Sequence, residues 1–115
     1  MIAVVGSLGL ALLFTLTGMA KLQGLPTAMA VRDRLGVSPA LWRGIGVAEL
    51  AGAFALVVGA VAMPNLALLA LGALTALMVG SVVAHVRVSD RPGGVVAGAV
   101  LLLCLVDVWL VVSFR

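Results

Sequence analysis

Charged residues are scarce in this chain, and their scarcity argues against a soluble fold. Only 10% of the 115 residues are Asp, Glu, Lys or Arg, whereas soluble domains average about 25%. Tyrosine is absent, and two Trp and three Phe leave few rings on which nucleic-acid bases could stack. The basic residues fall between apolar runs rather than along one face. We therefore expect no nucleic-acid partner, despite the net charge of +3.

Cysteine and histidine each occur once, which excludes several kinds of chemistry. The single Cys104 cannot form an internal disulfide or a dithiol redox pair, and its apolar surroundings favour a structural role. One His and few carboxylates do not make a metal cage, so no metal site is expected. No glycine-rich phosphate loop or Ser-His-Asp order is present. No catalytic residue can be assigned, and we expect no catalysis by this chain alone.

Long apolar runs dominate what remains, because 64% of the residues are hydrophobic. A helix needs about 20 apolar residues to cross the hydrocarbon core of a bilayer. Four stretches meet that length, at residues 2–20, 44–63, 66–86 and 95–114. The sequence predicts an all-α polytopic membrane protein, with residues 1–115 forming one transmembrane four-helix bundle in a lipid bilayer.

Two short connections separate the last three spans. Pro64-Asn65 is predicted to form a tight turn, because proline disfavours helix in the residue before it. Residues 87–94 are polar and contain Pro and two Gly, which indicates a second turn.

The longest connection, residues 21–43, contains a short segment of its own. Residues 26–35 are expected to form one or two turns of helix, with Gly36 as the stop. Ser38-Pro39 has the character of an N-cap and first helical position for the helix that carries the second span.

The basic residues predict an orientation. Six of the seven fall in the first and third connections, and only Arg115 and the terminal amine lie on the other side. The positive-inside rule then places both long connections in the cytoplasm and both termini outside, in a bacterial plasma membrane. Cleavage of the first span as a signal peptide is an alternative, because Gly18 and Ala20 are small, but no basic residue precedes the apolar run.

Small residues recur at four-residue spacing in the spans. Gly72, Ala76, Gly80 and Ala84 follow this spacing in the third span. Such stripes let helix backbones approach closely in a membrane. Tight packing within one bundle is the simpler interpretation, and a homo-oligomer interface is the alternative.

Polar groups inside the spans are the functional candidates, because burying them in lipid is costly. Glu49 lies roughly 8 Å inside the second span. Lys21 and His85 lie at the same end of their spans, with Thr17 and Ser81 one turn deeper on the same faces. These five residues can converge on one pocket at the cytoplasmic mouth. They either lock the bundle through a Lys21–Glu49 pair, or form a ligand pocket in which Glu49 and His85 exchange protons.

Asp107 is a secondary candidate, roughly 18 Å into the fourth span and nearer the outer side. Thr75 of the third span falls at a similar depth and is expected to hydrogen-bond to it. This contact either locks two helices or forms a second proton or ligand site.

Several short motifs resemble those of the DoxX-like membrane proteins. Residues 13–14 (Leu-Phe) and 18–22 (Gly-Met-Ala-Lys-Leu) resemble the end of the family's first helix. Residues 46–52, with a glutamate between glycines, resemble its second helix. Residues 78–87, followed by Asp90, resemble the end of its third helix. The order and spacing match along the whole chain, whereas the fourth span matches only as an apolar helix.

The resemblance implies a four-helix fold and an association with redox chemistry. Some relatives are subunits of thiosulfate:quinone oxidoreductases, and others accompany proteins of oxidative-stress defence. Lys21, Glu49 and His85 match polar positions of the family, whereas Asp107 has no such support.

Three functions remain open after this comparison. The first is an accessory redox subunit that holds a quinone-like lipid or anchors an oxidoreductase subunit in the membrane. The second is a small proton-coupled transporter, and the third is a purely structural subunit of a membrane complex.

Overall fold

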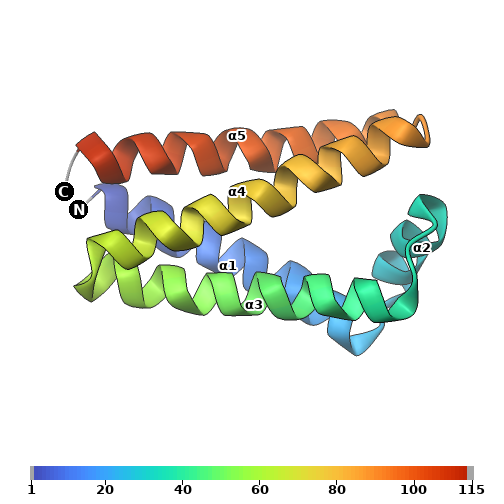
Figure 1. Cartoon of the computed structure of the whole chain (residues 1–115), viewed down its shortest axis with the longest axis horizontal. Helices are drawn as coiled ribbons and strands as arrows, with labels where there is room; N and C mark the ends of the chain where they lie inside the picture. The colour runs from blue at the N-terminus through green and yellow to red at the C-terminus, as the bar shows by residue number, and fades with distance from the viewer. Residues whose placement is uncertain (1, 114–115) are drawn as a thin grey trace.

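The computed structural model describes residues 2–113, and every regular element in that range is helical. Figure 1 shows the five helices in chain order. The all-α prediction is confirmed. The helices are α1 (Ile2–Gln23), α2 (Pro26–Leu35), α3 (Pro39–Ala62), α4 (Pro64–Arg87) and α5 (Arg91–Ser113).

Four of these helices are long and apolar enough to cross a membrane. They contain 22, 24, 24 and 23 residues, and about 20 residues suffice to span the hydrocarbon core. The longest dimension of the described chain is 40 Å, which exceeds the roughly 30 Å thickness of that core. The protein is therefore an integral membrane protein, as predicted.

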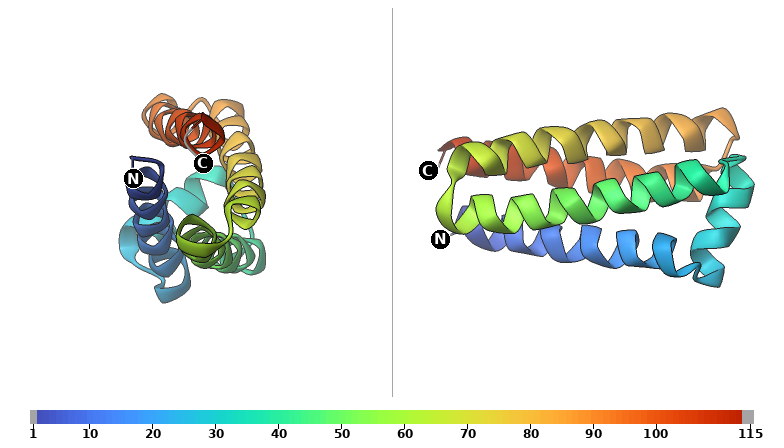
Figure 2. Two further views of the ribbon diagram at one scale, coloured as in Figure 1. Left: turned by 90° about the vertical axis from the view of Figure 1, so that its left-hand side faces the viewer. Right: turned by 60° about the horizontal axis from the view of Figure 1, so that its bottom comes forward.

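The four long helices form an antiparallel bundle in which chain neighbours pack together. α1 packs mainly on α3, α3 on α4, and α4 on α5, whereas the contact between α1 and α5 is smaller. Figure 2 shows α1 and α5 on the same side of the bundle, with both ends of the chain at one end of it. We call this the terminal end. The opposite end, which α2 crosses, is the α2 end.

The helices are longer than the predicted spans, and one predicted turn is wrong. Pro64 is the first residue of α4, so the joint with α3 is Met63 alone rather than Pro64-Asn65. Proline fits the first helical position because the missing N–H has no partner there in any case. α3 begins at Pro39, five residues before the predicted span. The predicted end of the fourth span, Phe114, and Arg115 lie outside the described residues.

The short helix α2 and its two boundaries follow the prediction closely. It has 10 residues, somewhat more than the expected one or two turns. Gly36 ends it with a φ of 69°, and its N–H donates to the carbonyl of Asp33. The side chain of Ser38 accepts a hydrogen bond from the N–H of Leu41, which confirms it as the N-cap of α3.

The packed core lies between the middle of the bundle and the terminal end. Its fully buried members come from α1, α3, α4 and α5 and include Phe14, Leu56, Leu71, Leu74 and Cys104. α2 contributes no buried residue. The core therefore holds the long helices together and leaves α2 outside it.

Close helix approach occurs at glycines outside the predicted α4 stripe. A Cβ on Gly18 would lie 2.9 Å from the carbonyl oxygen of Gly46, so α1 and α3 meet backbone to backbone there. A Cβ on Gly72 or Gly80 would meet no atom within 4 Å. The predicted packing of the α4 stripe within the bundle is therefore wrong at these two glycines.

Candidate functional site

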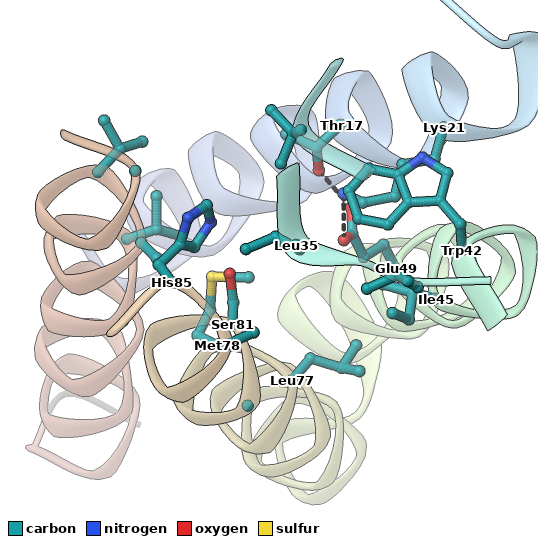
Figure 3. Close-up of a pocket in the computed structure, with 18 of the residues that line it drawn as sticks. Thr17, Lys21, Leu35, Trp42, Ile45, Glu49, Leu77, Met78, Ser81 and His85 are labelled. Atoms are coloured by element: carbon teal, nitrogen blue, oxygen red, sulfur yellow. Dashed lines mark hydrogen bonds and ion pairs between the residues drawn. The ribbon is translucent and has the colours of Figure 1, made fainter. Parts of the chain in front are cut away.

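A cavity of about 660 Å³ opens inside the α2 end of the bundle. Side chains from all five helices line it, and all five residues of the predicted pocket are among them. Figure 3 shows Thr17, Lys21, Glu49, Ser81 and His85 around this space. The rest of the lining is mostly apolar and includes Leu35, Leu77 and Met78.

Glu49 is held on the α1–α3 side of the cavity by two donors from α1. Its side chain is almost fully buried, with the residue 1% exposed. Lys21 Nζ lies 2.7 Å from Oε1 of Glu49, and the Thr17 hydroxyl donates a short hydrogen bond to Oε2. Lys21 Nζ also lies 5.0 Å from the centre of the Trp42 ring, within the range of a cation–π interaction. Both carboxylate oxygens thus have a hydrogen-bond donor, and the Lys21 ammonium also contacts the face of the Trp42 ring.

His85 is held on the opposite side of the cavity by Asp90. His85 Nδ1 lies 2.8 Å from Oδ2 of Asp90, and both residues are buried. Arg34 of α2 donates to the same oxygen at 3.1 Å. The N–H of Gly93 donates to the other oxygen at 3.2 Å, so Asp90 also caps the start of α5.

Asp90 lies in the turn between α4 and α5, where its neighbours favour the charged form. The hydrogen bond from His85 is the largest cause that holds the pKa of Asp90 below its usual value. The Gly93 N–H and the charge of Arg34 act in the same direction, while desolvation opposes them. The group therefore remains a carboxylate over a wider pH range than a free Asp.

The structure brings the five predicted residues to one cavity but divides them into two groups. Thr17, Lys21 and Glu49 are bonded to one another, and His85 is bonded to Asp90. The hydrogen bonds of Glu49 go to α1, and Figure 3 shows the His85 ring across the cavity from it. Direct proton exchange between Glu49 and His85 would need an intervening group in the cavity.

The small residues of α4 form part of the cavity wall. Ala76, Gly80 and Ala84 all line the space, and a Cβ on Gly80 would meet nothing within 4 Å. Their spacing, which suggested a packing face, instead places small residues on the cavity wall beside Leu77 and Met78.

Asp107 lies away from this cavity, in the packed half of the bundle. It is 2% exposed, and its Oδ2 accepts a 2.8 Å hydrogen bond from the Ser7 hydroxyl of α1. The predicted partner, Thr75, does not bond to it, since the Thr75 hydroxyl is buried with no hydrogen-bond partner among the described residues. Asp107 therefore joins α5 to α1 rather than to α4.

Sequence reasoning missed four residues that complete these sites. Trp42 lies under Lys21, Arg34 and Asp90 complete the His85 cluster, and Ser7 bonds Asp107. The signal for Asp90 was its position five residues after His85, with a turn between them. The signal for Ser7 was its depth, because it lies near the terminal end of α1 as Asp107 does of α5. No group of three His, Cys, Asp or Glu side chains within residues 2–113 could hold a metal ion.

Comparison with known families gives one match. A sequence model described as the DoxX-like family matches residues 5–108, from the first turn of α1 to the last turns of α5. No curated protein and no solved structure matches the chain.

Proposed function

Because the chain belongs to the DoxX-like family of membrane proteins, we propose that it is a redox-associated accessory protein whose cavity holds an uncharged, quinone-like lipid. Lys21, Glu49, Thr17, Ser81 and His85 would form the polar part of this site. The protein would not catalyse electron transfer by itself.

The observation that carries the proposal is the pairing of charges around an apolar cavity. Of the ionisable side chains that line it, Lys21 and Glu49 neutralise each other at 2.7 Å. His85 is bonded to the carboxylate of Asp90. A cationic ligand would need an unpaired carboxylate, and an anionic one would need an unpaired base. An uncharged head group with an apolar tail matches this lining better than either.

The polar groups of the cavity suit a ring that carries oxygen atoms. The Ser81 hydroxyl and the His85 ring line the same side of the space, on α4. A carbonyl or hydroxyl of the ligand could hydrogen-bond there, while its tail lies along Leu77, Met78 and Val100.

The electrons for any redox role would come from a partner. The chain has one cysteine and therefore no dithiol. We propose an oxidoreductase subunit as that partner, with this protein as its membrane anchor or quinone holder. Gentle extraction followed by native mass spectrometry tests this, and a complex that contains only this chain and phospholipid would contradict it.

Fluorescence of Trp42 tests the ligand directly. The chain has two tryptophans, and Trp109, which is 61% exposed on α5, can be replaced by Phe to leave Trp42 at the cavity. Titration with a short-chain ubiquinone should quench Trp42 in a saturable way. A lipophilic cation such as tetraphenylphosphonium should not compete. Competition by the cation, or quenching that rises linearly without saturation, would refute the proposal.

A matched pair of alanines on α4 controls this experiment. Ala84 lines the cavity, whereas Ala73 is exposed on the same helix and does not. Ala84→Phe should weaken quinone binding by about tenfold or more, equivalent to roughly 1.4 kcal/mol. Ala73→Phe should leave the affinity unchanged. Equal effects would place the ligand outside the cavity.

A proton-coupled transporter is less well supported by the same geometry. Small cation exporters need a carboxylate that is free to exchange a proton for a substrate. Here Glu49 accepts from both Lys21 and Thr17. Glu49→Gln with loss of substrate-driven proton flux in liposomes would revive this alternative.

A further inference from the structure

α2 forms part of the cavity wall without belonging to the core. Figure 1 shows it running across the end of the bundle, from the end of α1 toward the turn between α4 and α5, before the chain returns to the start of α3. Val31 and Leu35 of α2 line the cavity, so the helix forms one of its walls. None of its 10 residues is buried. A wall of this kind can move without disturbing the packing of the four spans.

Glycines in left-handed conformations lie on both sides of α2. Gly24 and Gly36 each have a φ of 69°, and a Cβ on either would meet nothing within 4 Å. Both positions therefore use glycine for backbone conformation and not for close packing. They separate α2 from α1 and α3 at backbone conformations that favour glycine.

One ion pair connects α2 to the opposite side of the bundle. Arg34 Nη1 lies 3.1 Å from Oδ2 of Asp90, in the turn between α4 and α5. Among residues 2–113 no other ion pair joins α2 to another element, since Arg32 pairs with Asp33 inside α2. The Arg34 side chain is 49% exposed, so water and salt can reach the pair.

The same carboxylate oxygen also contacts the cavity. Oδ2 of Asp90 accepts from Arg34 on α2 and lies 2.8 Å from Nδ1 of His85, which lines the cavity. His85 therefore connects the cavity lining to the oxygen that accepts from Arg34.

We propose that α2 is a hinged lid over the cavity and that the Arg34–Asp90 ion pair is its latch. The lid controls access of the ligand from the aqueous side, and His85 connects the latch to the cavity. The inference rests on the proposed function only in taking the cavity as the ligand site.

A cysteine inside the cavity measures how often the lid opens. Ser81→Cys places a thiol on the lining, and N-ethylmaleimide is an uncharged reagent that reports its accessibility in detergent. Cys104 is buried, and the protein without Ser81→Cys gives the background. Arg34→Gln should label about two- to fivefold faster, the factor expected from losing a half-exposed ion pair.

Arg32→Gln is the matched control, because the hydrogen bonds that its side chain donates to its neighbour Asp33 stay within α2. It should label at the parental rate, and Arg34→Lys should restore most of that rate. High salt should accelerate labelling of the parent but not of Arg34→Gln. Ala84→Cys provides a second reporter on the cavity wall if Ser81→Cys unfolds the protein.

Equal rates in the parent and Arg34→Gln would overturn the latch. Acceleration by Arg32→Gln as large as by Arg34→Gln would also overturn it, as would absence of labelling in every variant. No ligand takes part in this measurement. Its failure is therefore distinct from failure of the quinone proposal, which the Trp42 titration tests.

Discussion

The two ends of the bundle provide different partners and surroundings for their buried polar groups. At the α2 end, charges are paired around an open space, as Lys21 and Glu49 are at 2.7 Å. At the terminal end, Asp107 has one donor, Ser7, and its other oxygen has no hydrogen-bond partner among the described residues. The first arrangement surrounds a cavity of about 660 Å³, whereas the second lies among fully buried side chains.

The two ends of the bundle therefore differ in role. Close packing at the terminal end stabilises the fold, and the cavity at the α2 end leaves space for binding. Leu71 and Leu74 are fully buried in the core, while Leu77, one turn further along α4, lines the cavity. One helix therefore contributes to both halves. Packing at the terminal end fixes the positions of the helices. At the α2 end, the same helices hold their polar side chains on opposite sides of the cavity.

The largest effect should come from removing one member of the paired charges. Lys21→Met leaves the carboxylate of Glu49 buried without a counter-charge, and we expect a loss of about 3–5 kcal/mol in the free energy of unfolding. Chemical unfolding in mixed micelles, followed by circular dichroism, measures it. The double variant Lys21→Met with Glu49→Gln should recover most of the loss. A single variant as stable as the parent would mean that the pair is solvated.

A smaller loss in the free energy of unfolding should follow when a leucine is shortened, and it should be larger in the packed core than at the cavity. Leu74→Ala creates a new void beside Gly52, which contacts its side chain, and should cost about 2–4 kcal/mol. Leu77→Ala only enlarges an existing cavity and should cost less than about 1 kcal/mol. The same unfolding measurement compares the two. Equal losses would show that the cavity is filled or collapsed in the folded protein.

The smallest effect should appear as a pH dependence at the α2 end. The folded-state pKa of Asp90 is lowered, chiefly by the His85 hydrogen bond. Its stabilising contribution is therefore complete above the unfolded value of about 4 and is lost as the pH falls from there through the lower folded value. As the pH decreases through that window, the melting temperature of the parent should decrease, and that of Asp90→Asn should decrease less. If the melting temperatures of the parent and Asp90→Asn decreased equally with pH, Asp90 would be excluded as the titrating group responsible.

Much of the fold and part of the site could be predicted from the sequence. Four apolar runs of sufficient length leave few options in a membrane, and the depths of Lys21, Glu49 and His85 along their spans indicated a common end. The Arg34–Asp90 contact could not be predicted, because the direction of α2 depends on the backbone angles at Gly24 and Gly36.

Two of the errors also have physical reasons in how the helices are rotated. The spacing of small residues on α4 gives one face of that helix but does not say what lies opposite it, so a cavity wall was taken for a packing face. Thr75 and Ser7 both lie at the depth of Asp107. Only the rotation of each helix decides which hydroxyl points at the carboxylate.

The bond between Ser7 and Asp107 joins residues that are 100 positions apart in the sequence. A ribosome makes Ser7 well before Asp107, so α1 can enter the bilayer before this partner exists. Until α5 follows, the inner face of α1 is covered at this level only by α3 or by lipid. A chain truncated before α5 would retain the α1–α3 and α3–α4 pairs but would lack this closing contact.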